Sequence, residues 1–329
     1  MLSDLKFLEL ARSVRHADED TARALRQDVL DARAKSNERF AARHEDFAST
    51  YEATQELRTS IRVALTLGRP LLLTGEPGTG KTLCAYWIAE LFGKDKVKRF
   101  QVKSDSRAKD LLYAFDAAAW FRESDIRSQV LDKRDFLHKR ELGEALGWDG
   151  TPSSPAVVLI DEIDKAPRDF PNDLLHELDQ MSFKVEETGH LVECPANRRP
   201  IVVITSNSER QLPPPFLRRC VLHHIVLDPP TISRILLARL AAWDVAETDI
   251  AFLSAATTFW VELGEKDLGR KPTIDEYWRW LAIELEFSGK SMATLTASLR
   301  DRKSEELHFA TSFLSPADLN EVFPPKATS

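Results

Sequence analysis

Eight consecutive residues supply most of the chemistry that the sequence offers. They fit the pattern G-x-x-x-x-G-K-[ST] of a phosphate-binding loop, and they are Gly75, Glu76, Pro77, Gly78, Thr79, Gly80, Lys81 and Thr82. Glycines let backbone N–H groups approach phosphate oxygens without a Cβ in the way, and a helix starting near Lys81 adds its positive end. Lys81 then places a charge on the β- and γ-phosphates, and the Thr82 hydroxyl binds Mg²⁺. This segment, with Leu83 directly after it, predicts an ATP site.

Two adjacent carboxylates follow a run of four apolar residues. The run from Val157 to Ile160 predicts a buried strand, and Asp161 and Glu162 stand at its C-terminal end, where parallel α/β sheets bind ligands. Asp161 is suited to hold Mg²⁺ through water, and Glu162 to orient and polarise the water beside the γ-phosphate. The alternative is a solvated acidic pair, but the phosphate-binding loop earlier in the chain favours the catalytic interpretation.

Polar groups at two later positions complete the candidate site. Asn207 follows an apolar run at 201–205. It either hydrogen-bonds the attacking water or the γ-phosphate, or forms an Asx-turn as the chain leaves the strand. Arg218 and Arg219 precede the last predicted strand. One of them either reaches a neighbouring subunit's γ-phosphate as an arginine finger, or forms a salt bridge on its own subunit's surface.

Short apolar runs around these motifs predict a parallel sheet. Such runs, separated by helical stretches, are typical of a sheet covered by helices on both faces. Strands are expected at 71–73, 97–102, 157–160, 201–205 and 221–227, with a hairpin inserted at 183–194. A helix before the first strand should end at Gly68, and another should run from Leu83 to Phe92.

The rest of the chain has helical patterns. Residues 1–50 contain no Pro or Gly and predict charged helices that either recruit partners or are merely solvated. Thr231 is expected to cap a helix through Trp243, the capping-box sequence from Thr273 to open a second helix, and Ser315 to begin a short terminal one. We therefore expect an N-terminal helical extension (1–50), an α/β nucleotide-binding domain (51–228) and an all-helical lid (229–329).

Composition limits the remaining options. The formal net charge of −7 gives no general attraction to nucleic acid or anionic membrane. The three cysteines form no CxxC pair, which argues against a zinc site and a disulfide framework. No apolar run approaches the ~18 residues of a membrane span, so a cytoplasmic location is expected. His223 and His224 lack metal-binding neighbours in the sequence, and Trp278 and Trp280 are expected to pack in a core.

The order of these motifs resembles that of an AAA+ ATPase and, within that superfamily, of the MoxR class. The resemblance covers about residues 51–285 and rests on GEPGTGKT (75–82), LIDEIDKAPRDFPNDLL (159–175), ITSNSERQLPPPFLRRC (204–220) and GRKPTIDEYWRWL (269–281). It implies that Asn207 is the first sensor and that Arg219, rather than Arg218, is the finger. Relatives of the MoxR class usually carry a GxxxPR-like sequence at the lid. The sequence here departs from it, which leaves Lys271 or Arg270 for the second sensor.

The resemblance also implies a homo-oligomer, a hexameric ring, that remodels or activates a protein partner, often one with a von Willebrand factor A domain. The segment 103–110, followed by Tyr113, Phe115, Trp120 and Phe121, is similar to MoxR-like subunits of multi-protein bacterial conflict systems. These aromatic residues either face the pore of the ring or belong to an ordinary core helix. Two other functions stay open: a nucleotide-gated scaffold, and a nucleic-acid motor that the acidic balance disfavours.

Overall fold

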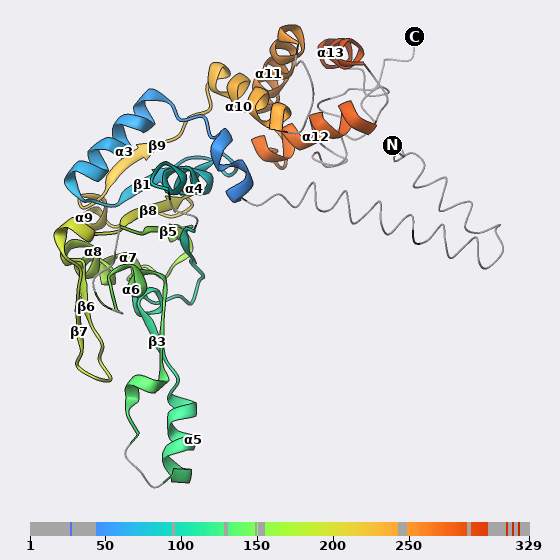
Figure 1. Cartoon of the computed structure of the whole chain (residues 1–329). Coiled ribbons are helices and arrows are strands. Elements are labelled where there is room, and N and C mark those ends of the chain that lie inside the picture. The colour runs from blue at the N-terminus through green and yellow to red at the C-terminus, as the bar shows by residue number, and fades with distance from the viewer. Residues whose placement is uncertain are drawn as a thin grey trace, which may run out of the picture. The chain divides into compact units, whose positions relative to one another are not determined.

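The computed structural model describes residues 44–93, 96–127, 131–148, 155–242, 249–287 and 291–301, with Gln27, Gly150, Leu314, Asp318 and Val322 (Figure 1). The chain divides into two compact units. One comprises Ala53–Val226, and the other joins Met1–Glu52 to Leu227–Ser329. Each unit has a hydrophobic core of its own.

A five-stranded parallel sheet lies in the Ala53–Val226 unit. Its strand order is β2 (Lys98–Gln101), β5 (Val157–Asp161), β8 (Ile201–Ser206), β1 (Leu71–Thr74) and β9 (Val221–His224). Every residue of β5 is buried, because its apolar side chains face cover on both sides of the sheet. β2 is an edge strand whose exposure alternates along the chain. The predicted α/β fold with five parallel strands is confirmed.

Helices cover both faces of this sheet. On one face α3 (Gln55–Leu67) packs on β1 and β9, and α4 (Lys81–Leu91) packs on β5 and β8. α3 ends as predicted at Gly68, whose φ of 60° is the left-handed conformation of a helix C-cap. The other face packs against α6 (Glu141–Ala145), α7 (Phe170–Asp173), α8 (Leu175–Gln180) and α9 (Pro214–Leu217).

Two antiparallel hairpins are inserted between strands of the main sheet. The first pairs β3 (Tyr113–Phe115) with β4 (Leu137–Lys139) and carries α5 (Ala117–Arg127), which Figure 1 shows at its far end from the sheet. The second pairs β6 (Ser182–Lys184) with β7 (Leu191–Glu193), and confirms the hairpin expected at 183–194. Short 3-10 helices complete the unit: η2 (Ala108–Leu111), η3 (Lys133–Phe136), η4 (Ile163–Lys165) and η5 (Ala196–Arg198).

The aromatic residues of the first hairpin do not form one core helix. Tyr113 is buried at 2% exposure on β3, where its ring stacks on Phe183 of the second hairpin. Phe121 of α5 is 62% exposed and meets the Trp120 ring edge-on at 4.9 Å between centroids. The alternative of an ordinary core helix is therefore wrong for α5, whereas a position facing a pore stays a prediction.

The other unit is helical throughout its described part. It contains η1 (His44–Thr50), α10 (Pro229–Ala242), α11 (Ile250–Glu265), α12 (Ile274–Phe287) and α13 (Met292–Asp301). Phe47 of η1 packs edge-on against Trp278, so the end of the predicted extension shares this core. Trp278 and Trp280 are buried, as expected. Trp243, Ser315 and nearly all of residues 1–43 lie outside the described residues.

The helix starts of this unit follow two capping signals. α10 begins two residues before Thr231, the cap expected from the sequence. Asp228 takes that role, because its carboxylate accepts the Thr231 N–H at 2.9 Å and proline is tolerated in a first turn. The capping box before α12 is confirmed: Thr273 N–H donates to Glu276 at 2.8 Å, and Glu276 N–H donates back to the Thr273 hydroxyl at 3.2 Å. No helix in the described part of the chain is long and apolar enough to cross a membrane.

Candidate active site

The phosphate-binding loop joins β1 to α4. The three leucines of β1 are buried, so the chain leaves the sheet at a fixed point and turns sharply through Gly75, Gly78 and Gly80. The last two have φ of 80° and 87°, which favour glycine over any residue with a Cβ. α4 then begins at Lys81, and because the first N–H groups of a helix have no partner within it, this end of α4 is suited to bind phosphate.

Lys81 is folded into this loop. Its ammonium donates to the carbonyls of Gly75 at 2.8 Å and Glu76 at 2.7 Å, and the residue is only 6% exposed. Burial lowers the pKa of Lys81, while nearby carboxylates, Asp164 first, act in the opposite direction. Thr79 closes the turn with a hydroxyl bond to the Glu76 carbonyl.

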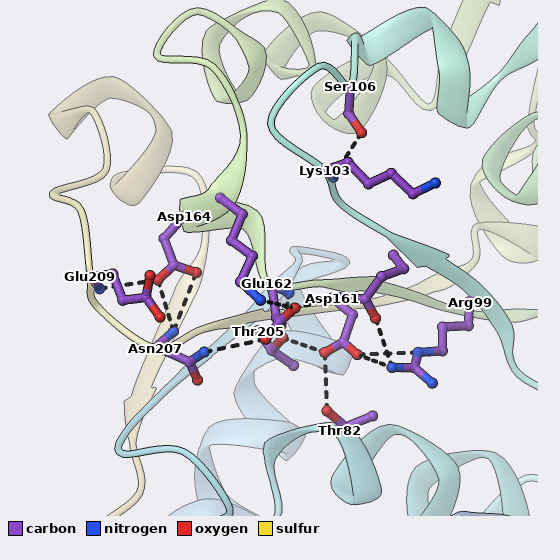
Figure 2. Close-up of polar contacts among 12 residues, drawn as sticks. Thr82, Arg99, Lys103, Ser106, Asp161, Glu162, Asp164, Thr205, Asn207 and Glu209 are labelled. Carbon is purple, nitrogen blue, oxygen red and sulfur yellow. Dashed lines mark hydrogen bonds and ion pairs between the residues drawn. The ribbon is translucent and has the colours of Figure 1, made fainter. Parts of the chain in front are cut away.

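Thr82 connects the loop to the carboxylate pair. Its hydroxyl donates to Asp161 Oδ1 at 3.0 Å, and the Thr205 hydroxyl donates to the same oxygen at 2.6 Å (Figure 2). Asp161 is 2% exposed at the C-terminal end of β5. Leu83, the next residue along α4, is buried as well. The two predicted metal ligands, Thr82 and Asp161, are therefore in direct contact.

Glu162 leaves the strand in a left-handed conformation, with φ of 60°. Its backbone N–H donates to the Thr205 hydroxyl at 2.9 Å. Its carboxylate accepts from Gln101 at 2.5 Å and from Lys165 at 2.6 Å. It also accepts from the Asn207 amide at 3.5 Å (Figure 2). The hydrogen bond to Glu162 raises the pKa of Lys165. Glu162 and Asn207 thus lie side by side.

Asp164 fixes the chain that carries Asn207. It is 3% exposed, and its two carboxylate oxygens accept the N–H groups of Asn207, at 3.3 and 3.1 Å, and of Glu209, at 3.0 Å. Among the described residues of this segment, the Asn207 side chain forms no Asx-turn hydrogen bond with the backbone that follows it. The Asn207 side chain is thereby able to meet Glu162.

The two arginines and the proposed second sensor are not among these contacts. Arg219 forms an ion pair with Asp179 of its own subunit, which is the surface salt bridge weighed above. Within the described part of the chain the Arg218 guanidinium has no hydrogen-bond or ion-pair partner; its carbonyl accepts from Arg69 at 3.5 Å. Lys271 belongs to the helical unit, where it donates to the Gly264 carbonyl at 3.1 Å.

Four residues around the carboxylates escaped the sequence reasoning: Arg99, Gln101, Asp164 and Thr205. Arg99 donates to Asp161 Oδ2 at 2.6 and 3.1 Å. Arg99 and Gln101 are two positions apart on edge strand β2. The register between β2 and β5 places Gln101 beside Asp161. The available signal was the weak apolar character of residues 97–102. Polar side chains on a strand next to the carboxylates indicate that the strand contacts them.

Comparison with known proteins agrees with this geometry. Residues 70–220 match the family described as "AAA domain (dynein-related subfamily)". This segment has the AAA+ fold. A search of the curated proteins finds no significant match to the sequence.

Two solved structures are similar at low identity. One is a mutant of RuvB from Thermotoga maritima, with 15% identity, a TM-score of 0.47, and coverage of 77% of this chain and 70% of that one. The other is NtrX from Brucella abortus in complex with ATP, with 16% identity, a TM-score of 0.46, and coverage of 93% and 68%.

Proposed function

We propose that this chain hydrolyses ATP, with Glu162 as the general base. The observation that carries the proposal is the 3.0 Å contact between Thr82 and Asp161, which sets the phosphate-binding loop against the carboxylate pair. Glu162 would take a proton from water as the water oxygen bonds to the γ-phosphorus and the bond to the ADP oxygen breaks. Asn207 would orient that water, and Lys81 would neutralise the β- and γ-phosphates.

The donor set fits a magnesium ion. Thr82 and Asp161 offer a hydroxyl and a carboxylate oxygen, the hard ligands that Mg²⁺ prefers, and Mg²⁺ typically completes its shell with phosphates and water. No cluster of three His, Cys, Asp or Glu side chains that could hold a metal occurs among the described residues, so a resident all-protein metal cage is not expected. When bound, Mg²⁺ would screen the negative charge that develops on the phosphates.

Three variants test the proposal. Glu162→Gln should bind ATP normally and turn it over roughly 100-fold more slowly or worse, since general-base catalysis contributes about that much. Lys81→Ala should lose ATP binding. Glu209→Gln is the matched control, because the hydrogen bond of Glu209 to this network comes from its backbone N–H and is kept in the variant. Wild-type turnover by Glu162→Gln would remove Glu162 from the mechanism.

The finer assignment is a ring subunit of the MoxR class that remodels or activates a protein partner, which the resemblance suggests is one with a von Willebrand factor A domain. This part rests on the motif order and on the position of Arg218 and Arg219 directly before β9. Either the ion pair between Arg219 and Asp179 breaks when subunits assemble, which frees Arg219 to act as the finger, or Arg218 is the finger.

A mixing experiment decides between these roles. An arginine that acts in a neighbouring site will be supplied by Lys81→Ala subunits, so inactive Arg219→Ala and inactive Lys81→Ala subunits should regain activity when mixed. Arg218→Ala is tested in the same way. Asp179→Ala is the control, because a merely structural Arg219 would make this variant behave like Arg219→Ala.

A nucleotide-gated scaffold is the second candidate function. The observation that favours it is that the Glu162 carboxylate accepts hydrogen bonds from both Gln101 and Lys165. These bonds make the carboxylate less available as a base. Steady-state hydrolysis measured across protein concentration separates the two functions. Activity that rises with assembly supports the ring enzyme, and no activity in any assembled state supports the scaffold.

A further inference from the structure

Arg99 forms an ion pair with Asp161, the predicted metal ligand. From edge strand β2 its guanidinium reaches Asp161 Oδ2 through Nη2 at 2.6 Å and Nε at 3.1 Å (Figure 2). The other carboxylate oxygen, Oδ1, already accepts the hydroxyls of Thr82 and Thr205. Arg99 is thus a cation hydrogen-bonded to the carboxylate oxygen that the two hydroxyls leave open.

A cation beside Oδ2, whether bound directly or through water, would compete with this arginine for the same carboxylate charge. Two positive groups on one oxygen repel each other, and Asp161, at 2% exposure, has little water to screen them. The Arg99 side chain is 37% exposed and long, so it can leave toward solvent at small cost. Asp161 has no such freedom, because it ends a buried strand.

Arg99 is also linked to the catalytic carboxylate. Its Nη2 donates to Gln101 Oε1 at 2.7 Å, and Gln101 Nε2 donates to Glu162 Oε2 at 2.5 Å. Gln101 therefore presents its oxygen to Arg99 and its nitrogen to Glu162. When Arg99 departs, the amide loses the contact that fixes this orientation.

We propose that Arg99 is a positioning residue that competes with the magnesium ion for Asp161 and, through Gln101, keeps Glu162 engaged until the ion has taken its place. The inference rests on the proposed function, because it takes Asp161 as the metal ligand. It makes metal binding the event that releases the general base from Gln101, so that Lys165 and Asn207 are the contacts left to it. Arg99 contributes no atom to the reaction.

The test is a titration of the full-length protein with Mn²⁺ at saturating ADP, in which free Mn²⁺ is followed by electron paramagnetic resonance. Arg99→Gln removes the competing charge and should bind Mn²⁺ roughly five-fold more tightly, as for the loss of a half-exposed ion pair. Arg99→Lys should fall between this variant and wild type. Lys98→Gln is the matched control, since the neighbouring Lys98 pairs with Glu144 instead, and it should leave the affinity unchanged.

Thermal unfolding supplies a second readout. With chelator present, Arg99→Gln should unfold at a lower temperature than wild type because Asp161 has lost its partner, and Mn²⁺ with ADP should close that gap. Equal or weaker Mn²⁺ binding by Arg99→Gln, with normal binding by wild type, overturns the role of Arg99 alone. Failure of wild type to bind Mn²⁺ with ADP overturns both this role and the proposed function.

Discussion

Replacing Asp164 should loosen the chain that presents Asn207. Its carboxylate accepts two backbone N–H groups, from Asn207 and Glu209, in a site where it is 3% exposed. Hydrogen bonds to a charged acceptor contribute about 1.5–3 kcal/mol each. Because the two bonds share one carboxylate, we expect Asp164→Ala to destabilise this segment by about 3 kcal/mol. Asp164→Asn keeps one acceptor oxygen and should cost about half as much.

Hydrogen exchange measures this directly. The amides of Asn207 and Glu209 should exchange roughly 150-fold faster in Asp164→Ala, the factor that about 3 kcal/mol represents. ATP affinity should fall much less than turnover, since the hydrogen bonds of Lys81 and Thr82 do not involve Asp164. Asp132→Ala is the control: this more exposed carboxylate caps η3 through one N–H, and its loss should cost about 1 kcal/mol. Unchanged exchange at Asn207 in Asp164→Ala would refute the reasoning.

Four further predictions concern packing and protonation. Gly143→Ala should lower the unfolding free energy by at least ~2 kcal/mol, because its Cβ would lie 2.0 Å from the Leu112 carbonyl. Gly264→Ala in α11 meets nothing within 4 Å and should raise thermal stability by about 0.5–1 kcal/mol. Burial raises the pKa of Cys220 to about 12, and all three cysteines are buried. At pH 8 a thiol reagent should therefore modify fewer than one thiol per folded chain in its fast phase. Burial lowers the pKa of His223 from 6.5, so the unfolded chain binds this proton more readily and stability falls as pH drops below about 6.5. In His223→Gln the urea concentration at the unfolding midpoint should fall less than in wild type between about pH 7.5 and 5.5.

The sequence predicted the core of the sheet because burial leaves a strong pattern there. β1, β5 and β8 are runs of Val, Ile and Leu that end in polar residues, and a strand covered on both faces has few other solutions. Gly68 and Thr273 marked helix boundaries through local hydrogen bonds that involve only neighbouring residues. The start of α10 was misplaced because two prolines obscured a cap at Asp228, and a proline at the first helical turn looks the same as one in a loop.

The contacts of the site were less accessible to sequence reasoning. The phosphate-binding loop and the Asp161–Glu162 pair are contiguous patterns, whereas Arg99 and Gln101 act across a strand pairing that spans about sixty residues of chain. Their role depends on the register that places Gln101 beside Asp161, and no local pattern fixes a register between parallel strands. The Arg219–Asp179 pair likewise joins distant segments. Local chemistry was thus predictable, and its partners were not.

The conformation of Glu162 explains how two consecutive residues serve one site. Successive side chains of a strand point to opposite faces of the sheet, so a continued β5 would send Glu162 away from the face on which Asp161 meets Thr82. The φ of 60° at Glu162 ends the strand at that residue and redirects its side chain. A left-handed residue with a Cβ costs about 1 kcal/mol or more. The Thr205 hydroxyl offsets that cost by accepting the Glu162 N–H while donating to Asp161. One threonine therefore holds the carboxylate of Asp161 and the backbone of Glu162 at the same edge of the sheet, and the strain lies where the proposed chemistry needs it.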